Sequence, residues 1–193
     1  MPVSLLPGAR GDGVPLTTLL ELEDGTRLVH YFAGSADTPL MLASTAGYGF
    51  ASKAGDMISR QKGGKSFMTM EAGDEPLMPR VIGKNASAIA CLSENGRLLV
   101  FGLDEIKMQP GGGRGVTLME LDAKEKLIAA QPVSQKGVRI IGISSRAAKP
   151  QEISLSAAAL APHIGKRARK GRALAHWAAR MHSVYGYPMQ QVA

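Results

Sequence analysis

Residues 40–71 read LMLASTAGYGFASKAGDMISRQKGGKSFMTME, and residues 89–120 read IACLSENGRLLVFGLDEIKMQPGGGRGVTLME. The two stretches align without a gap at an offset of 49 residues. Their matched positions include Ser44 with Ser93, Gly47 with Gly96, Asp56 with Glu105, Gly63 and Gly64 with Gly112 and Gly113, Lys65 with Arg114, and Met70 and Glu71 with Met119 and Glu120. Chance similarity rarely keeps its register over this length, so the alignment indicates an internal repeat of about 50 residues.

Weaker copies of the repeat extend it over the chain. One runs from VRIIGISSRAAKPQEISL to KRARKGRALAHW, and ARGDGVPLTTLLELEDGTRL near the N-terminus matches the second half of an earlier copy. The predicted units are residues 1–38, 39–87, 88–136 and 137–187. We interpret the 193 residues as one domain built from these units, and as a fragment of a larger polypeptide.

The interior of each unit is predicted to consist of strands. IACLSENGRLLVF holds two β-rich runs around Asn95 and Gly96, a pair typical of a type I′ hairpin turn. Residues 116–121 alternate like a strand with one face in a core. Four short strands per unit form a blade-sized sheet that needs neighbours to bury its faces. The sequence therefore predicts an all-β, propeller-like array of three to four blades.

One segment, RALAHWAARMH (172–182), has apolar residues at helical spacing. The repeat register predicts a strand there instead. Because short apolar runs are ambiguous by periodicity, we follow the register.

The composition fits a folded, soluble chain, since 45% of the residues are hydrophobic and only 20% are charged. No apolar run approaches the roughly 20 residues of a membrane span, and the N-terminal residues lack the pattern of a signal peptide. We therefore expect a cytoplasmic protein that does not bind membranes. The single cysteine, Cys91, lies in an apolar run and is predicted to be a buried small hydrophobe.

Positive charge is concentrated at particular places in the chain. The net charge is +7, and no acidic residue follows Glu152. Basic glycine turns recur near residues 10–13, 62–65, 111–115 and 166–172, at the spacing of the repeat. Recurrence at matching positions favours a polyanion-binding site over a solvated basic face. The candidate binding residues are Arg10, Arg60, Lys62, Gly63, Gly64, Lys65, Arg114, Lys166, Arg167, Arg169, Lys170 and Arg172.

Three stretches, AGYGFASKAGDMISRQKGGKSFMTME, LSENGRLLVF and GKRARKGRAL, resemble the C-terminal domain of the A subunit of bacterial DNA topoisomerase IV, a relative of the gyrase A subunit. The resemblance covers essentially the whole chain. It implies a β-pinwheel, a propeller-like ring of four-stranded blades that exchange strands, whose basic outer edge binds duplex DNA in a bent path. Glycine turns bring backbone amides close to phosphates, and flanking cations add charge without reading bases. Contacts repeated along a curved edge offset the cost of bending DNA.

The resemblance also implies the setting of the domain. The intact type II topoisomerase would carry out ATP-dependent decatenation and supercoil relaxation in the nucleoid. The partners would be the N-terminal breakage-reunion domain of the same polypeptide and the topoisomerase IV B subunit, in an A2B2 holoenzyme. ATP and Mg²⁺ would be bound through the B subunit, so no cofactor is expected in this domain.

The glycine-rich box of gyrase A subunits, Gln-Arg-Arg-Gly-Gly-Arg/Lys-Gly, is matched only in part. RQKGGKS (60–66) and QPGGGRG (109–115) are partial copies. This favours topoisomerase IV and leaves the DNA-wrapping domain of gyrase as the alternative.

No catalytic residue and no metal ligand is predicted. Tyr31, Tyr48, Tyr185 and Tyr187 lack the context of a DNA-cleaving tyrosine, and His30, His163, His176 and His182 form no ligand set. GARGDG and GGGRG lack the Gly-Lys-Ser/Thr ending of a phosphate-binding loop. Two other classes remain open: a propeller-like protein-interaction module with incidental positive charge, and an enzyme with an unrecognised site.

Overall fold

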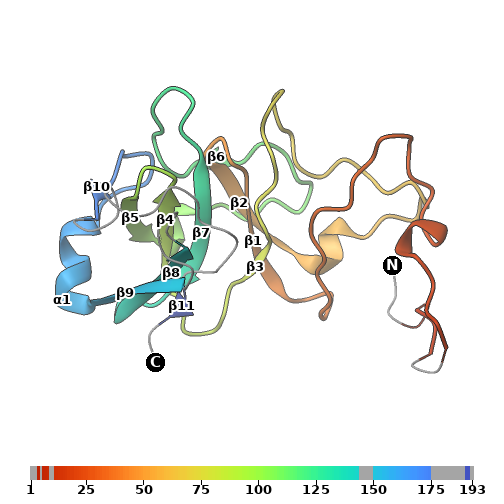
Figure 1. Ribbon diagram of the computed structural model, residues 1–193, viewed down its shortest axis with the longest axis horizontal. Coiled ribbons are helices and arrows are strands. Elements are labelled where there is room, and N and C mark those ends of the chain that lie inside the picture. The colour runs from red at the N-terminus through yellow and green to blue at the C-terminus, as the bar shows by residue number, and fades with distance from the viewer. Residues whose placement is uncertain (1–3, 5, 9–10, 144–149, 175–189, 192–193) are drawn as a thin grey trace.

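The computed structural model describes residues 4, 6–8, 11–143, 150–174 and 190–191, and the regular secondary structure within them is mostly β (Figure 1). The strands are β1 (Pro39–Ala43), β2 (Tyr48–Lys53), β3 (Arg80–Val81), β4 (Ala88–Ser93), β5 (Arg97–Gly102), β6 (Val116–Thr117), β7 (Leu127–Val133), β8 (Gly137–Ile143), β9 (Pro150–Ser156), β10 (Arg172–Ala173) and β11 (Gln190–Gln191). The short helices are α1 (Ala157–Leu160) and 3-10 turns at Leu16–Thr18, Ala54–Met57, Leu103–Glu105 and Ala161–His163. No described helix is long and apolar enough to cross a membrane.

The first two hairpins have the same register at an offset of 49 residues. In the first, Leu40 pairs with Ser52, and in the second, Ile89 pairs with Phe101, so both partners are displaced by 49 residues. A 3-10 turn follows the second strand of each hairpin. The described part of residues 1–38 contains a 3-10 turn and no strand.

The type I′ turn predicted at Asn95-Gly96 is wrong in its details. The N–H of Gly96 donates to the carbonyl of Ser93, so the central residues of the turn are Glu94 and Asn95. Asn95 is not among the described non-glycine residues with positive φ, whereas Gly96 has φ of 75°. A type I turn followed by a left-handed glycine is the usual geometry of a three-residue hairpin loop. Gly47 has the same role in the first hairpin, with φ of 84°.

In each four-stranded sheet, one of the two edge strands comes from the unit that follows in the sequence. The strand order is β3-β1-β2-β6 in the first sheet and β10-β5-β4-β7 in the second, while the third has three described strands in the order β11-β8-β9. β6 belongs to the unit of residues 88–136 but pairs with β2 of the unit of residues 39–87. β10 belongs to the unit of residues 137–187 but pairs with β5 of the unit of residues 88–136. The units are therefore linked by exchanged strands.

This exchange also corrects the strand predicted over residues 116–121. β6 ends at Thr117. The next residues leave the first sheet and run beside the basic turn at residues 165–171, where the N–H of Ala168 donates to the carbonyl of Leu118 and the N–H of Glu120 donates to the carbonyl of Arg169. Leu118 itself donates to the carbonyl of Gly47. At the C-terminal end, β10 confirms a strand at Arg172–Ala173, and residues 175–182 of the predicted segment lie outside the described residues.

The second sheet is buried on both faces, because β4 lies between two hydrophobic clusters. Ala88, Ala90 and Leu92 contribute to one cluster, which also contains side chains of β8. Ile89 and Cys91 contribute to the other, which also contains side chains of β1. Cys91 is fully buried, as predicted, and burial raises the pKa of its thiol. Blades of this size are thus stabilised by their neighbours.

A glycine allows each exchanged strand to reach the preceding sheet. Gly115 precedes β6 with φ of 80°, and a Cβ there would lie 2.3 Å from the carbonyl oxygen of Gly49. Gly171 precedes β10 with φ of 71°, and a Cβ there would lie 2.7 Å from the carbonyl oxygen of Leu98. Gly49 and Leu98 are equivalent positions of the repeat. Both glycines are therefore required by close backbone packing between units.

Candidate nucleic-acid interface

The first basic turn, residues 59–66, is held by its own hydrogen bonds. The Ser59 hydroxyl donates to the carbonyl of Gly64 at 3.2 Å, and the N–H of Gly64 donates to the carbonyl of Gln61 at 3.0 Å. Gly64 has φ of 81° and no atom within 4 Å of its Cβ position, so the backbone here is open to solvent. Lys65 Nζ donates to the Asp56 carbonyl at 2.5 Å and lies 5.3 Å from the centre of the Phe67 ring.

The second basic turn, residues 109–115, lies directly against the chain that leaves the first. The N–H of Gly113 donates to the Phe67 carbonyl at 2.9 Å, and the N–H of Thr69 donates back to the Gly113 carbonyl at 3.1 Å. Gly112 is required by this packing, since its Cβ would lie 2.1 Å from the Phe67 carbonyl oxygen. Arg114 stacks on the Tyr48 ring at 4.0 Å. The two turns are consequently neighbours on one surface.

The third basic turn, residues 165–171, continues the row through the segment 118–120 described above. The N–H of Gly165 donates to the carbonyl of Val100 at 2.8 Å, and that of Arg167 donates to the Glu105 carboxylate at 3.0 Å. Figure 1 shows this turn beside β10 at one end of the long axis, and the N-terminal segment at the other. Backbone hydrogen bonds thus connect the second turn to the chain after the first turn, and the third turn to the chain after the second.

The exposed cations among the predicted binding residues divide into three groups. Arg60, Lys166, Arg169 and Arg172 are exposed and form no ion pair with described residues. Lys62, Arg114 and Lys170 are exposed but each pairs with a carboxylate. Lys65 is exposed and bound to a backbone carbonyl.

Arg167 differs from the other predicted cations because its side chain is half-buried. Its Nη1 donates to the Thr117 carbonyl at 2.7 Å, at the end of β6. This bond connects the third turn to β6, the strand exchanged between the units of residues 39–87 and 88–136. Arg10 lies outside the described residues, and Gly63 lies at the solvent-exposed side of the first turn.

We predict that Arg167→Gln lowers the free energy of unfolding more than Arg169→Gln does. A hydrogen bond to a charged group contributes about 1.5–3 kcal/mol, so the free energy of unfolding should fall by about 2 kcal/mol. Urea denaturation of Arg167→Gln beside Arg169→Gln, which removes an exposed unpaired cation, measures the difference. Equal stability of the two variants would contradict the role assigned to Arg167.

The ion pair of Lys170 and Asp122 is the best defined on this surface, with 2.7 Å between Nζ and Oδ1. The hydrogen bond from Lys170 lowers the pKa of Asp122, and the same bond raises the pKa of Lys170. Asp122 also lies 3.4 Å from Arg97, which forms a buried ion pair with Glu125. This network joins the third turn to the second hairpin.

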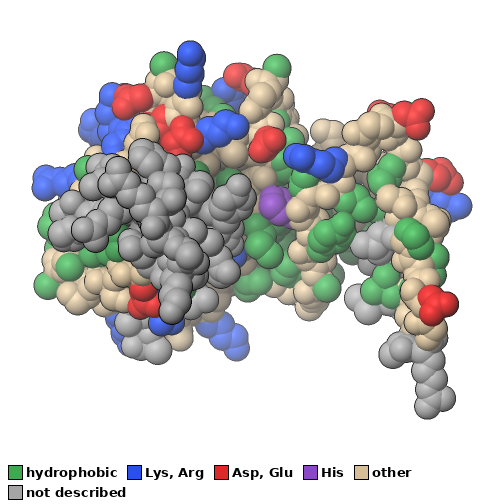
Figure 2. Space-filling model, viewed as in Figure 1, with side chains coloured by type: hydrophobic (Ala, Val, Ile, Leu, Met, Phe, Trp, Pro, Cys, Tyr) green, Lys and Arg blue, Asp and Glu red, His purple; other side chains and the backbone are tan. Residues whose placement is uncertain are grey.

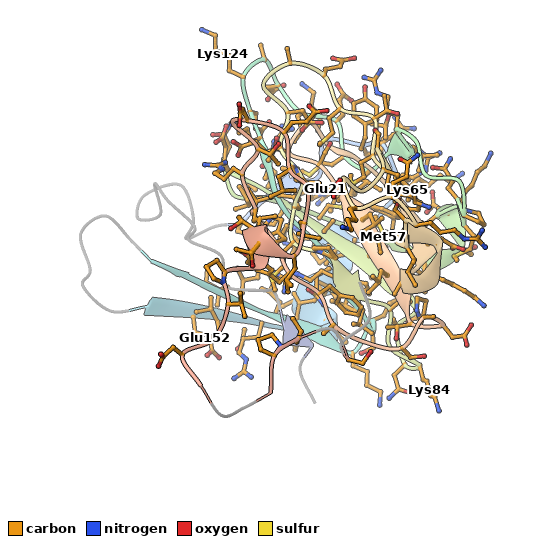
Figure 3. The ribbon with its side chains drawn as sticks, turned by 90° about the vertical axis from the view of Figure 1, so that its right-hand side faces the viewer. Glu21, Met57, Lys65, Lys84, Lys124 and Glu152 are labelled. Atoms are coloured by element: carbon orange, nitrogen blue, oxygen red, sulfur yellow. The ribbon has the colours of Figure 1, made fainter. Side chains whose placement is uncertain are left out.

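Sequence reasoning missed one basic residue beside the turns. Lys107 is exposed next to the second turn, but its repeat equivalent is Ile58, so the repeat gives no signal for it. Lys124 and Lys84 are exposed at opposite edges of the molecule, with Lys65 between them (Figure 3). Among the described residues, no group of His, Cys, Asp or Glu could hold a metal ion.

Four-stranded blades that exchange an outer strand, with basic turns at the start of each exchanged strand, define a β-pinwheel. The family model of the DNA gyrase C-terminal domain, a β-propeller, matches residues 88–134, which fall in the predicted unit of residues 88–136. The A subunit of DNA topoisomerase 4 from Neisseria gonorrhoeae is 34% identical over 175 residues, covering 88% of this chain and 22% of the relative. Its counterpart in Escherichia coli K12 is 32% identical over 120 residues, covering 62% of this chain and 16% of the relative.

Solved structures agree with these sequence matches. The E. coli ParC C-terminal domain superposes with a TM-score of 0.77 at 27% identity, covering 89% of this chain and 69% of that chain. A DNA gyrase A C-terminal domain has a TM-score of 0.64 at 18% identity over 81% of this chain and 50% of that one, which shows a common fold. The chain belongs to the family of C-terminal domains of the topoisomerase IV and gyrase A subunits. It spans about a fifth of the length of the curated relatives that it matches.

Proposed function

We propose that this chain binds duplex DNA along its basic turns without reading base sequence, as the C-terminal domain of a topoisomerase IV A subunit. The observation that carries the proposal is the row of three turns, in which the second and third are each bonded through the backbone to the chain that follows the preceding turn. Exposed cations lie on the first and third turns, and Arg114 lies on the second. Lysine and arginine contacts to phosphates give affinity without specificity.

The setting implied by the family extends the proposal. In an intact enzyme the domain would support ATP-dependent decatenation and supercoil relaxation by holding a bent DNA segment near the breakage-reunion domain. The B subunit would bind ATP and Mg²⁺, the cleaving tyrosine would lie outside this chain, and the assembly would act in the bacterial nucleoid. The partial glycine-rich boxes favour this role over DNA wrapping by gyrase.

Binding of the chain to linear duplexes of increasing length tests the proposal. We expect affinity to rise with length until the row of turns is covered, to be independent of sequence, and to fall with salt at a log-log slope of about −0.9 per phosphate contact. Fluorescence anisotropy with labelled duplexes measures both dependences. Two results would contradict the proposal and favour a protein-interaction module. One is undetectable DNA binding at a low salt concentration of about 50 mM. The other is a strong preference for one base sequence among duplexes of equal length.

Neutralising the unpaired cations of the third turn, together with Arg172 at the start of β10, tests where DNA lies on the protein. Lys166→Gln, Arg169→Gln and Arg172→Gln together should reduce the salt slope by up to about 2.7, or about 0.9 for each lost contact. The matched control is Lys84→Gln, Lys124→Gln and Lys136→Gln, which removes the same charge from exposed residues outside the three turns. If both triple variants reduce the slope equally, DNA binds through net charge and not through this row.

A further inference from the structure

We propose that the carboxylates of Glu21, Glu71 and Glu120 limit the affinity of the basic turns for DNA by occupying their cations in the free protein. This proposal rests on the proposed function, because it concerns residues that weaken binding of DNA to the turns. Each of these glutamates lies within ion-pair distance of a turn cation that a phosphate would otherwise contact.

The pairs recur with the repeat. Glu71 Oε1 lies 2.9 Å from Arg114 Nη2 in the second turn, and Glu120 Oε1 lies 3.9 Å from Lys170 Nζ in the third. Glu71 and Glu120 are equivalent positions, displaced by 49 residues. In both cases the carboxylate follows one turn and pairs with the cation of the next. Glu21, from the N-terminal segment, lies 3.4 Å from Lys62 in the first turn.

Both partners of each pair face solvent. The side chains of Glu21, Glu71 and Glu120 are 73%, 71% and 57% exposed, and those of Lys62, Arg114 and Lys170 are 75%, 44% and 52% exposed. Exposed ion pairs contribute little to stability, so these carboxylates are poorly explained as structural supports. Figure 2 shows acidic side chains among the Lys and Arg side chains over the upper part of the molecule.

A carboxylate and a phosphate offer the same kind of acceptor to a guanidinium or ammonium group. DNA must therefore displace each glutamate before it gains that cation, and the displaced carboxylate then lies close to the phosphates and repels them. Arg114 keeps its place without Glu71, because its guanidinium also stacks on the Tyr48 ring at 4.0 Å. Lys170 keeps Asp122 as a second acceptor, so its release should be the least complete of the three.

The test compares two triple variants that change net charge equally. Glu21→Gln, Glu71→Gln and Glu120→Gln should bind a saturating-length duplex at least about tenfold more tightly at about 0.1 M salt, with a salt slope steeper by about 1 to 3. The control is Asp37→Asn, Glu75→Gln and Glu152→Gln, which removes carboxylates from exposed ion pairs with Lys53, Arg27 and Arg139 away from the turns. The control should change affinity less than about threefold, because its effect comes only from screened, longer-range charge.

Three outcomes are distinguishable. If the wild-type chain does not bind DNA, the proposed function fails. If it binds and the test variant binds equally or more weakly than the control at an unchanged melting temperature, the glutamates position the cations and the inference is overturned. If the triple variant binds DNA more tightly than the control, the inference is supported. We then expect a larger gain in affinity from Glu71→Gln alone than from Glu120→Gln alone, because Asp122 still pairs with Lys170.

Discussion

Replacing Gly115 by alanine is expected to lower the free energy of unfolding by about 3 kcal/mol or more, the largest loss that we predict for a single methyl group. The added Cβ would lie 2.3 Å from the Gly49 carbonyl oxygen, which belongs to the backbone of β2 and has no freedom to rotate away. Pairing of β6 with β2 should be lost, and with it the closure of the first sheet. Chemical denaturation monitored by circular dichroism measures the change.

Gly64→Ala is the matched control for this prediction. Gly64 has φ of 81°, almost the same as Gly115, but no atom lies within 4 Å of its Cβ position. Its cost should be limited to the left-handed conformation, about 1 kcal/mol. The difference between the two variants therefore isolates the contact between units, and similar losses would show that backbone conformation alone is responsible.

Removing the charge of Glu125 should also be strongly destabilising. The carboxylate is 1% exposed and accepts bonds from Arg97 and from the N–H of Asp122 at 2.9 Å. Loss of one member of a buried ion pair leaves the other unpaired and costs about 3–5 kcal/mol, so Glu125→Gln should lose about 3 kcal/mol because Asp122 remains near Arg97. Glu152→Gln, which breaks the exposed pair with Arg139, should lose less than about 1 kcal/mol.

The lowered pKa of Glu125 makes the stability of the protein depend on pH. Burial by itself would raise the pKa of Glu125, but the bonds from Arg97 and Asp122 outweigh it and hold the pKa below the ordinary value of 4.5. A carboxyl with a depressed pKa contributes stability above its unfolded pKa and loses it as pH falls through the folded value. Wild-type stability should therefore fall as the pH drops below the ordinary glutamate pKa of 4.5, and the fall should be shallower in Glu125→Gln. Parallel pH profiles would contradict this assignment.

Local pattern predicted the hairpins well, because a repeat fixes which residues are equivalent and each hairpin is formed within one unit. It failed where the fold depends on contacts between units. Residues 116–121 have the alternation of one strand, but β6 ends at Thr117 because the chain crosses from the first sheet to the third turn. The alternation of residues within a segment predicts a strand but does not predict which sheet that strand joins.

For the candidate site, the sequence indicates the turns but not every contact of their side chains. The glycine turns carry their signal in the sequence, and most of their cations are exposed. Arg167 looks like its neighbours in sequence but binds a carbonyl 50 residues earlier, which only the folded chain brings near. Arg97 and Glu125 had no repeat signal, since their equivalents are Tyr48 and Pro76.

The exchanged strands set an order in which the chain can fold as it is synthesised. The hairpin β1–β2 is complete when residue 53 has left the ribosome, but its outer partner β6 arrives only with residues 116–117. The hairpin β4–β5 waits in the same way for residues 172–173. The outer edges of β2 and β5 are thus unpaired until the following unit has been synthesised, so each of these two sheets is completed only by a strand of the next unit.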